Sequence, residues 1–138
     1  MINNGGTILI VDDNSLEVLI TKRSFEKLGI RTKLVHVEDG QKAIDYLTEN
    51  DRPSIILLDI NMPSMDGLEF LKRRNQNPNW CSIPVIIFSS SKPQENLKAA
   101  FKLGISGYMV KPIDFEEMTE LLRAIVNYWS LSEHAEYA

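Results

Sequence analysis

The feature that most constrains the fold is a regular alternation of short apolar runs with amphipathic segments. Five apolar runs of strand length occur, at residues 7–11, 32–37, 54–58, 84–88 and 107–110. The first, third and fourth are almost continuously apolar rather than alternating, which is typical of strands covered on both faces. The pattern therefore predicts a sheet whose inner strands are buried beneath helices.

The amphipathic segments carry recognisable helix start signals. The clearest follows Asp114, which forms a capping pattern with Glu117, and its apolar residues repeat at three- and four-residue spacing: Phe115, Met118, Leu122, Ile125 and Trp129. Another helix is expected from Ser91, with Gln94 at its third position and one apolar face made of Leu97, Ala100 and Phe101.

Two of these segments end with the same residues, "KLGI". Gly29 and Gly104 in these strings suit the left-handed residue that closes a helix. Five strands and five helices in strict alternation predict an α/β fold, a doubly wound parallel sheet with helices on both faces. The 138 residues show no linker and no second core, so we expect one domain with a core over about 6–129, a tail at 130–138, and no output domain.

Composition excludes several classes of function. The net charge of -4, without a dense basic stripe, argues against nucleic acid as a partner. We expect no signal peptide and no membrane association, because the apolar runs are too short to span a bilayer. The single cysteine, Cys81, rules out an intrachain disulfide and fits a cytoplasmic location. Cys81 has no adjacent histidine, which favours a filler role over that of a nucleophile.

Acidic residues gather where predicted strands end. Ligands of doubly wound sheets bind outside the carboxyl ends of the strands. The residues that follow the first, third, fourth and fifth runs are Asp12 with Asp13, then Asp59, then Ser89 to Ser91, and then Lys111. Three close carboxylates repel one another by roughly 4 kcal/mol per pair at a surface-like dielectric, which predicts a hard divalent cation such as Mg²⁺.

An isolated pair of aspartates after a strand is more often a helix cap than a ligand set. The convergence of Asp12, Asp13, Asp59 and Lys111 on one edge favours the metal site instead. In "LLDINMPSMDGLEFL", Asp59 ends the strand, and Asn61 can offer a backbone carbonyl. An aspartate beside Mg²⁺ and a lysine can attack phosphorus, with catalysis resting on positioning and charge neutralisation.

Four motifs occur in a recognisable order and spacing: "VDD" at 11–13, "LDINMPSMDG" at 58–67, "IPVIIFSSS" at 83–91 and "GYMVKP" at 107–112. With them, the sequence resembles the receiver domain of the two-component response regulator family over nearly its whole length. The resemblance implies a flavodoxin-like (βα)5 fold with strand order 2-1-3-4-5. The long stretch "NQNPNWCSIP" resembles the small single-domain regulators that serve cyanobacterial and bacterial phytochromes.

The resemblance also implies residue roles. Asp59 would be the phosphoacceptor of an aspartyl phosphate. Asp13, Asp59 and the backbone carbonyl of Asn61 would ligate Mg²⁺, with Mn²⁺ as an alternative, and Asp12 would act through a bound water. Lys111 would hold a phosphoryl oxygen.

Ser89 would bind another phosphoryl oxygen, and Ser90 would belong to the same phosphoryl-binding set. Many receivers have a smaller residue at the position of Ser90. Ser89 and Tyr108 would form the conformational switch, and the bond before Pro112 would be cis. Without the resemblance, the sequence favours Ser89 as an ordinary residue at the end of a strand and Tyr108 as an aromatic residue of the core. His36 and His134 are not needed for phosphoryl transfer, because the partner kinase would supply the imidazole of the donor phosphohistidine.

Three functions fit the sequence. The first is a phosphorylation-activated signalling switch that is not an enzyme. Its partners would be a sensor histidine kinase, with a phytochrome-type kinase as one candidate, and an unknown downstream protein. The second is a Mg²⁺-dependent phosphatase, which Asn61 disfavours because an amide cannot serve as a general acid. The third is a phosphate-independent interaction module, which the complete acid set disfavours. Tyr128, Trp129 and Leu131 could form a homodimer patch, although core packing explains Trp129 equally well.

Overall fold

A parallel sheet of five strands in the order β2-β1-β3-β4-β5 forms the centre of the structure. The structure is a computed structural model that describes residues 6–30, 32–62, 65–90 and 97–131. Strands and helices alternate in these ranges: β1 (Thr7–Val11), α1 (Ser15–Lys27), β2 (Lys33–Val37), α2 (Gly40–Glu49), β3 (Ile55–Leu58), α3 (Gly67–Asn75), β4 (Val85–Ser89), α4 (Leu97–Lys102), β5 (Gly107–Val110) and α5 (Phe115–Leu131). The predicted fold class and strand order are confirmed.

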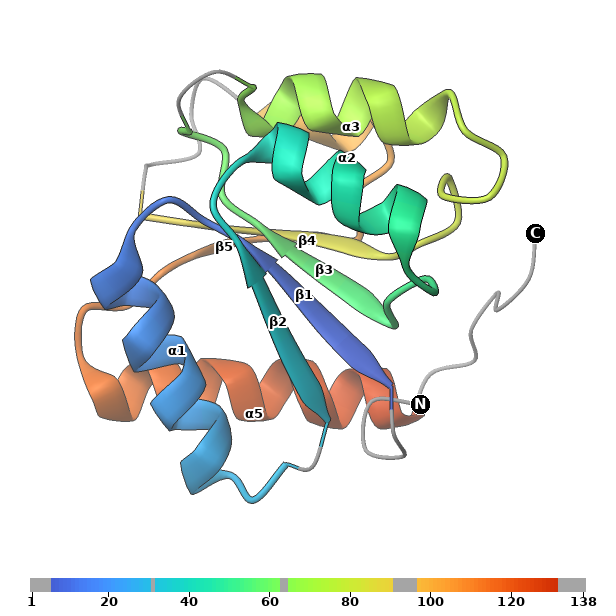
Figure 1. Cartoon of the computed structure of the whole chain (residues 1–138). Helices are drawn as coiled ribbons and strands as arrows, with labels where there is room; N and C mark the ends of the chain where they lie inside the picture. The colour runs from blue at the N-terminus through green and yellow to red at the C-terminus, as the bar shows by residue number, and fades with distance from the viewer. Residues whose placement is uncertain (1–5, 31, 63–64, 91–96, 132–138) are drawn as a thin grey trace.

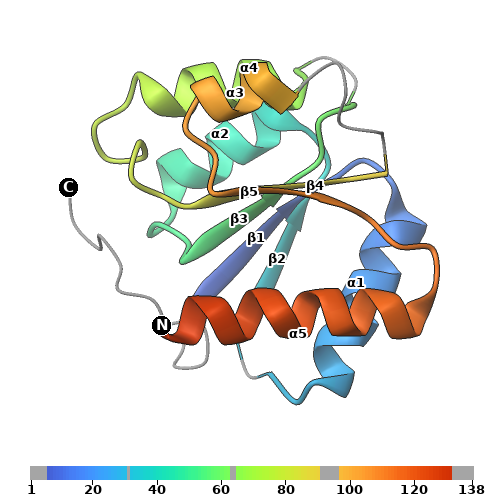
Figure 2. The ribbon, with the colours of Figure 1, turned by 180° about the vertical axis from the view of Figure 1, so that it is seen from behind.

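Helices cover both faces of the sheet. Figure 1 shows α1 and α5 on one face and α2 and α3 on the other, and the reverse view in Figure 2 places α4 in the layer with α2 and α3. Each face has its own apolar core, and alternate residues of the inner strands enter one core or the other. For example, Leu9 and Leu58 join the core beneath α2 and α3, whereas Ile10 and Leu57 join the core beneath α1 and α5.

Burial follows the sequence pattern. All residues of β3 and β4 are buried, and so are four of the five residues of β1. The edge strands β2 and β5 are only partly buried. The continuous apolar runs therefore mark the inner strands, as predicted.

The strand register determines where the strand ends lie. Val11 of β1 pairs with Val37 and with Leu58, while Ser89 of β4 pairs with Val110 of β5. Because the strands are parallel and nearly in step, the residues that follow them emerge at one edge of the sheet. This register is what brings the acidic residues and Lys111 together.

Helix boundaries confirm several of the local signals. Glu117 N donates to Asp114 Oδ2 at 3.0 Å, so the predicted cap of α5 is present. Gly29 and Gly104 adopt positive φ values of 69° and 85°, as expected for residues that close helices. Helix α5 extends to Leu131, two residues beyond the predicted core boundary.

The helix expected from Ser91 is described only as α4, in which Ala100 is buried and Phe101 remains 50% exposed. Ser91 and Gln94 lie outside the described residues, as do His134 and most of the predicted tail. Within the described ranges, none of the helices has the length and apolar content needed to cross a bilayer.

Candidate functional site

Three carboxylates meet at the carboxyl edge of the sheet. Asp12 and Asp59 are buried at the ends of β1 and β3, and Asp13 is exposed beside them. One carboxylate oxygen from each of the three lies within 4.8 Å of the other two. The structure therefore brings together the three acids that the sequence predicted would converge.

Asp59 is held by two donors on the same oxygen. Ser89 Oγ donates to Asp59 Oδ1 at 2.8 Å, and the backbone N–H of Asn61 donates to it at 3.4 Å. Burial raises the pKa of Asp59 above its ordinary value, and the charge of Asp12 raises it further, although the Ser89 hydrogen bond and the charge of Lys111 act in the opposite direction. The Asp59 carboxylate is thus a buried negative charge that Ser89 and Lys111 compensate only in part.

Lys111 follows β5 and points back into the acidic edge. Its backbone N–H donates to Ser89 O at 2.9 Å, which extends the pairing of β4 and β5 by one residue. Its ammonium binds Asp12 Oδ2 and Glu17 Oε1, the latter at 2.8 Å. Burial lowers the pKa of Lys111, but the hydrogen bonds to Asp12 and Glu17 outweigh it, so the pKa lies above its ordinary value. The lysine is therefore a fully charged counterion within the site.

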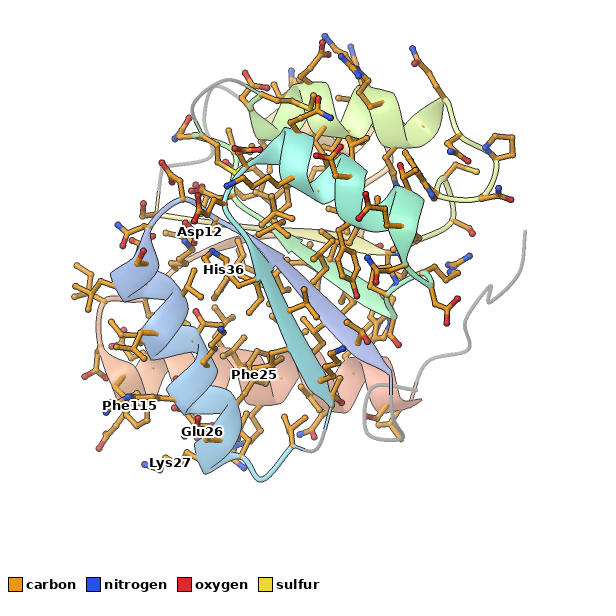
Figure 3. All side chains as sticks on the ribbon, in the orientation of Figure 1. Asp12, Phe25, Glu26, Lys27, His36 and Phe115 are labelled. Carbon is orange, nitrogen blue, oxygen red and sulfur yellow. The ribbon has the colours of Figure 1, made fainter. Side chains whose placement is uncertain are left out.

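Two neighbours of Asp12 were not predicted as parts of the site. One is Glu17, in the first turn of α1. The other is His36 of β2, whose Nε2 lies 2.7 Å from the carbonyl oxygen of Asp12 (Figure 3). A carbonyl only accepts, so Nε2 carries the proton in this contact. Pairing of β1 with β2 places His36 opposite Ile10, and this long-range register is invisible in the sequence.

The acid set fits a divalent cation. Among the described residues, Lys111 is the one cation paired with these carboxylates, and its ion pair is with Asp12. Asp12 is already engaged, because Lys111 and the backbone N–H of Asn14 occupy its two oxygens. Asp13 is exposed and has no hydrogen-bond or ion-pair partner in the described part of the chain. Asp13 and Asp59 are thus the better placed direct ligands, and oxygen donors of this kind suit Mg²⁺. The Asn61 carbonyl as a ligand stays a prediction.

The loop after β3 depends on a glycine. Asp66 caps α3 by accepting from Glu69 N at 2.9 Å, and the helix begins at Gly67. A Cβ atom at Gly67 would lie 2.7 Å from the carbonyl oxygen of Asp59. Only glycine allows α3 to start this close to the candidate phosphoacceptor.

The remaining predicted site residues lie around this centre. Tyr108 is half-buried, and its hydroxyl is buried without a hydrogen-bond partner in the described ranges. Burial, together with the charge of Asp59, raises its pKa. Ser90 is exposed at the end of β4, and its role in phosphoryl binding stays a prediction.

The predicted cis bond before Pro112 is wrong, since every described peptide bond is trans. The trans bond is the intrinsic preference even before proline, by about 0.5–1 kcal/mol. With this bond trans, Lys111 N donates to Ser89 O and the Lys111 ammonium binds Asp12.

Comparison with known proteins identifies the class to which this fold and site belong. Residues 8–123 match the family "Response regulator receiver domain". The chain is therefore a member of the response regulator receiver family. Proteins of this family act as phosphorylation-activated switches in two-component signalling, which implies a histidine kinase as partner.

Individual relatives and solved structures show which response regulators the chain is similar to. The chain is 31% identical over 127 residues to the probable methanogenesis regulatory protein FilR2 of Methanothrix harundinacea, covering 88% of this chain and 82% of the relative. It is similar to the crystal structure of the phosphorylated cyanobacterial phytochrome response regulator RcpA, with a TM-score of 0.87, 25% identity, and coverage of 95% and 99% of the two chains. The Mn²⁺-bound form of response regulator Rcp1 matches with a TM-score of 0.82, 26% identity, and coverage of 93% and 96%.

Proposed function

We propose that this chain is a signalling switch that accepts a phosphoryl group on Asp59 from the phosphohistidine of a histidine kinase. The observation that carries the proposal is the buried Asp59 carboxylate, within 4.8 Å of two further acids and hydrogen-bonded to Ser89. Membership of the receiver family supports the same assignment.

In the transfer step, a carboxylate oxygen of Asp59 forms a bond to phosphorus while the bond from phosphorus to the imidazole nitrogen of the donor breaks. The leaving imidazole keeps the electron pair and takes a proton from solvent. Ser89 ends β4, and Lys111 follows the neighbouring strand β5. The Ser89 hydroxyl and the Lys111 ammonium can each donate to a phosphoryl oxygen. The chain itself supplies positioning and positive charge.

The cofactor in this proposal is Mg²⁺, held by Asp13 and Asp59 directly and by Asp12 through water, with Mn²⁺ able to replace it. When bound, the ion neutralises charge on the acids and on the phosphoryl group. The acid set supports this choice, and so does the Mn²⁺-bound form of the similar protein Rcp1.

The kinase in this proposal is of the phytochrome type, because RcpA and other similar structures are phytochrome response regulators. The output is a protein contact in the cytoplasm, made by an unidentified target or by a second copy of the chain. Tyr128 and Leu131 at the end of α5 are 65% and 88% exposed and suit such a contact, while Trp129 packs against the core. Size-exclusion chromatography with and without phosphorylation tests self-association.

The proposal treats the chain as a phosphoacceptor and not as an enzyme. A phosphatase that uses an aspartyl nucleophile needs a general acid near the leaving group, and Asn61 offers only an amide. Slow loss of the phosphoryl group is the result that suits a switch.

Intact mass spectrometry after incubation with Mg²⁺ and a small phosphodonor separates these functions. The switch predicts one phosphoryl group per chain and little free phosphate. Many rounds of phosphate release would favour the phosphatase, and an unmodified chain would favour a passive interaction module. Chelation of the metal should abolish the addition if the acids act as proposed.

A further inference from the structure

Lys111 has two acidic partners, and both come from the β1 to α1 segment. Its ammonium bonds to Asp12 Oδ2 and to Glu17 Oε1, the second at 2.8 Å. The Lys111 side chain is only 3% exposed, and that of Glu17 is 27% exposed. Within the described residues, Lys111 thus forms its ion pairs with Asp12 and Glu17 and not with Asp59. Asp59 Oδ1 instead accepts a hydrogen bond from Ser89.

Local geometry explains why Glu17 is available for this contact. Asn14 caps α1 by accepting from Glu17 N at 3.1 Å, so Glu17 is the third helical residue. A glutamate at this position ordinarily folds back onto the backbone N–H of the capping residue. Here that N–H donates to Asp12 Oδ1 at 2.9 Å, and the Glu17 carboxylate is left to bind Lys111.

This arrangement bears on the proposed phosphorylation of Asp59, on which the inference rests. A phosphoryl group on Asp59 would need the ammonium that Asp12 and Glu17 hold in the unphosphorylated chain. Any free energy that Glu17 contributes to the resting position of Lys111 opposes its move to the phosphoryl group. A carboxylate next to the site would thereby weaken the phosphorylated state.

We propose that Glu17 is a positioning residue that restrains Lys111 on the Asp12 side of the site and so limits both the rate of phosphorylation and the lifetime of the phosphoryl group. Glu17 itself touches neither the acceptor carboxylate nor the transferred group. Its effect passes through Lys111 alone.

The test compares Glu17→Gln with the wild-type chain. The amide keeps the shape of the side chain but removes the charge that attracts Lys111. Phosphorylation by a small donor with Mg²⁺ should become faster, and loss of the phosphoryl group slower, each by about two- to fivefold, the size expected for one partly exposed ion pair. Intact mass spectrometry over time measures both rates.

A matched control is Glu69→Gln. Glu69 is also the third residue of a helix, with its N–H bonded to the capping Asp66 at 2.9 Å, and it has no contact with Lys111. If the effect came only from lost charge at a helix start, both variants would change alike, and the inference would be overturned. Unchanged or slower phosphorylation in Glu17→Gln would overturn it as well.

A second readout needs no phosphoryl group. The ¹⁵N resonance of the Lys111 ammonium should shift in unphosphorylated Glu17→Gln and stay in place in Glu69→Gln. An unmoved resonance would show that the contact does not restrain Lys111. If the wild-type chain takes up no phosphate at all, the proposed function fails, while this spectrum still tests the contact by itself.

Discussion

Replacing Asp59 by asparagine is expected to stabilise the unphosphorylated protein. The asparagine side chain keeps an oxygen that can accept from Ser89 Oγ and from Asn61 N, so the hydrogen bonds at Asp59 Oδ1 can persist. What disappears is a buried negative charge beside two others. A substitution in the centre of the site should therefore strengthen the fold.

The magnitude follows from the separation of the charges. Two carboxylate oxygens 4.8 Å apart repel with about 3.5 kcal/mol at an effective dielectric of about 20, and Asp59 faces two such neighbours. Attraction to the ammonium of Lys111 offsets part of this repulsion. Water around the exposed Asp13 weakens the remainder, so we expect the free energy of unfolding to rise by about 1–3 kcal/mol.

The effect should depend on pH with a definite sign. Burial raises the pKa of Asp59 above its ordinary value of 3.8, so the neutral acid is favoured more in the native state than in the unfolded chain. The stability associated with that neutral form is present below pH 3.8 and is lost as the pH rises through the native pKa. The advantage of Asp59→Asn should therefore be greatest near pH 7 and should shrink as the pH falls.

Urea unfolding followed by far-ultraviolet circular dichroism, in chelator and in Mg²⁺, measures these differences. Mg²⁺ should stabilise the wild-type chain more than the variant, which has lost a ligand. Asp51→Asn is the matched control, because Asp51 is exposed and precedes β3, at the opposite edge of the sheet. The reasoning is refuted if Asp59→Asn lowers stability, or if Asp51→Asn has the same effect.

Three further substitutions test other contacts. Lys111→Met should destabilise the metal-free protein by about 3–5 kcal/mol in urea unfolding, because Asp12 would remain buried without its cation, and Mg²⁺ should restore part of the loss. Gly67→Ala should cost about 1–3 kcal/mol and slow phosphorylation, since its Cβ would meet the backbone oxygen of Asp59 at 2.7 Å; thermal melting and intact mass measure the two effects. His36→Phe should cost about 1–3 kcal/mol by leaving the Asp12 carbonyl unpaired, and equal stability in urea would show that the bond contributes nothing.

The sequence predicted the fold well because the strands are short apolar runs, and the three inner strands are almost continuously apolar. The strands at 7–11 and 107–110 were placed at their observed bounds, and the other three to within one residue at each end. The acids were predicted to converge because parallel strands end at a common edge, which requires only the order of elements along the chain. Asp12, Asp13 and Asp59 could therefore be grouped from the sequence alone.

Contacts that depend on side-chain direction could not be predicted in the same way. In the sequence, Glu17 is an ordinary helix-start residue. In the structure, Asp12 accepts the N–H of Asn14, and the Glu17 carboxylate binds Lys111. His36 binds the Asp12 carbonyl through the register of two strands that are separated by α1. The isomer before Pro112 was predicted wrongly for a similar reason. The cis and trans bonds before a proline differ little in free energy, so the surrounding structure decides between them.

The measurement that tests the central claim most directly is the location of the phosphoryl group. The protein would be phosphorylated by a small donor with Mg²⁺, reduced with borohydride to convert an acyl phosphate into a stable alcohol, and mapped by tandem mass spectrometry. We predict a single reduced side chain, at Asp59, and none in Asp59→Asn. Reduction at Asp12 or Asp13 instead, or phosphate recovered as a borohydride-resistant ester on Ser89, would contradict the assignment of Asp59 as the acceptor.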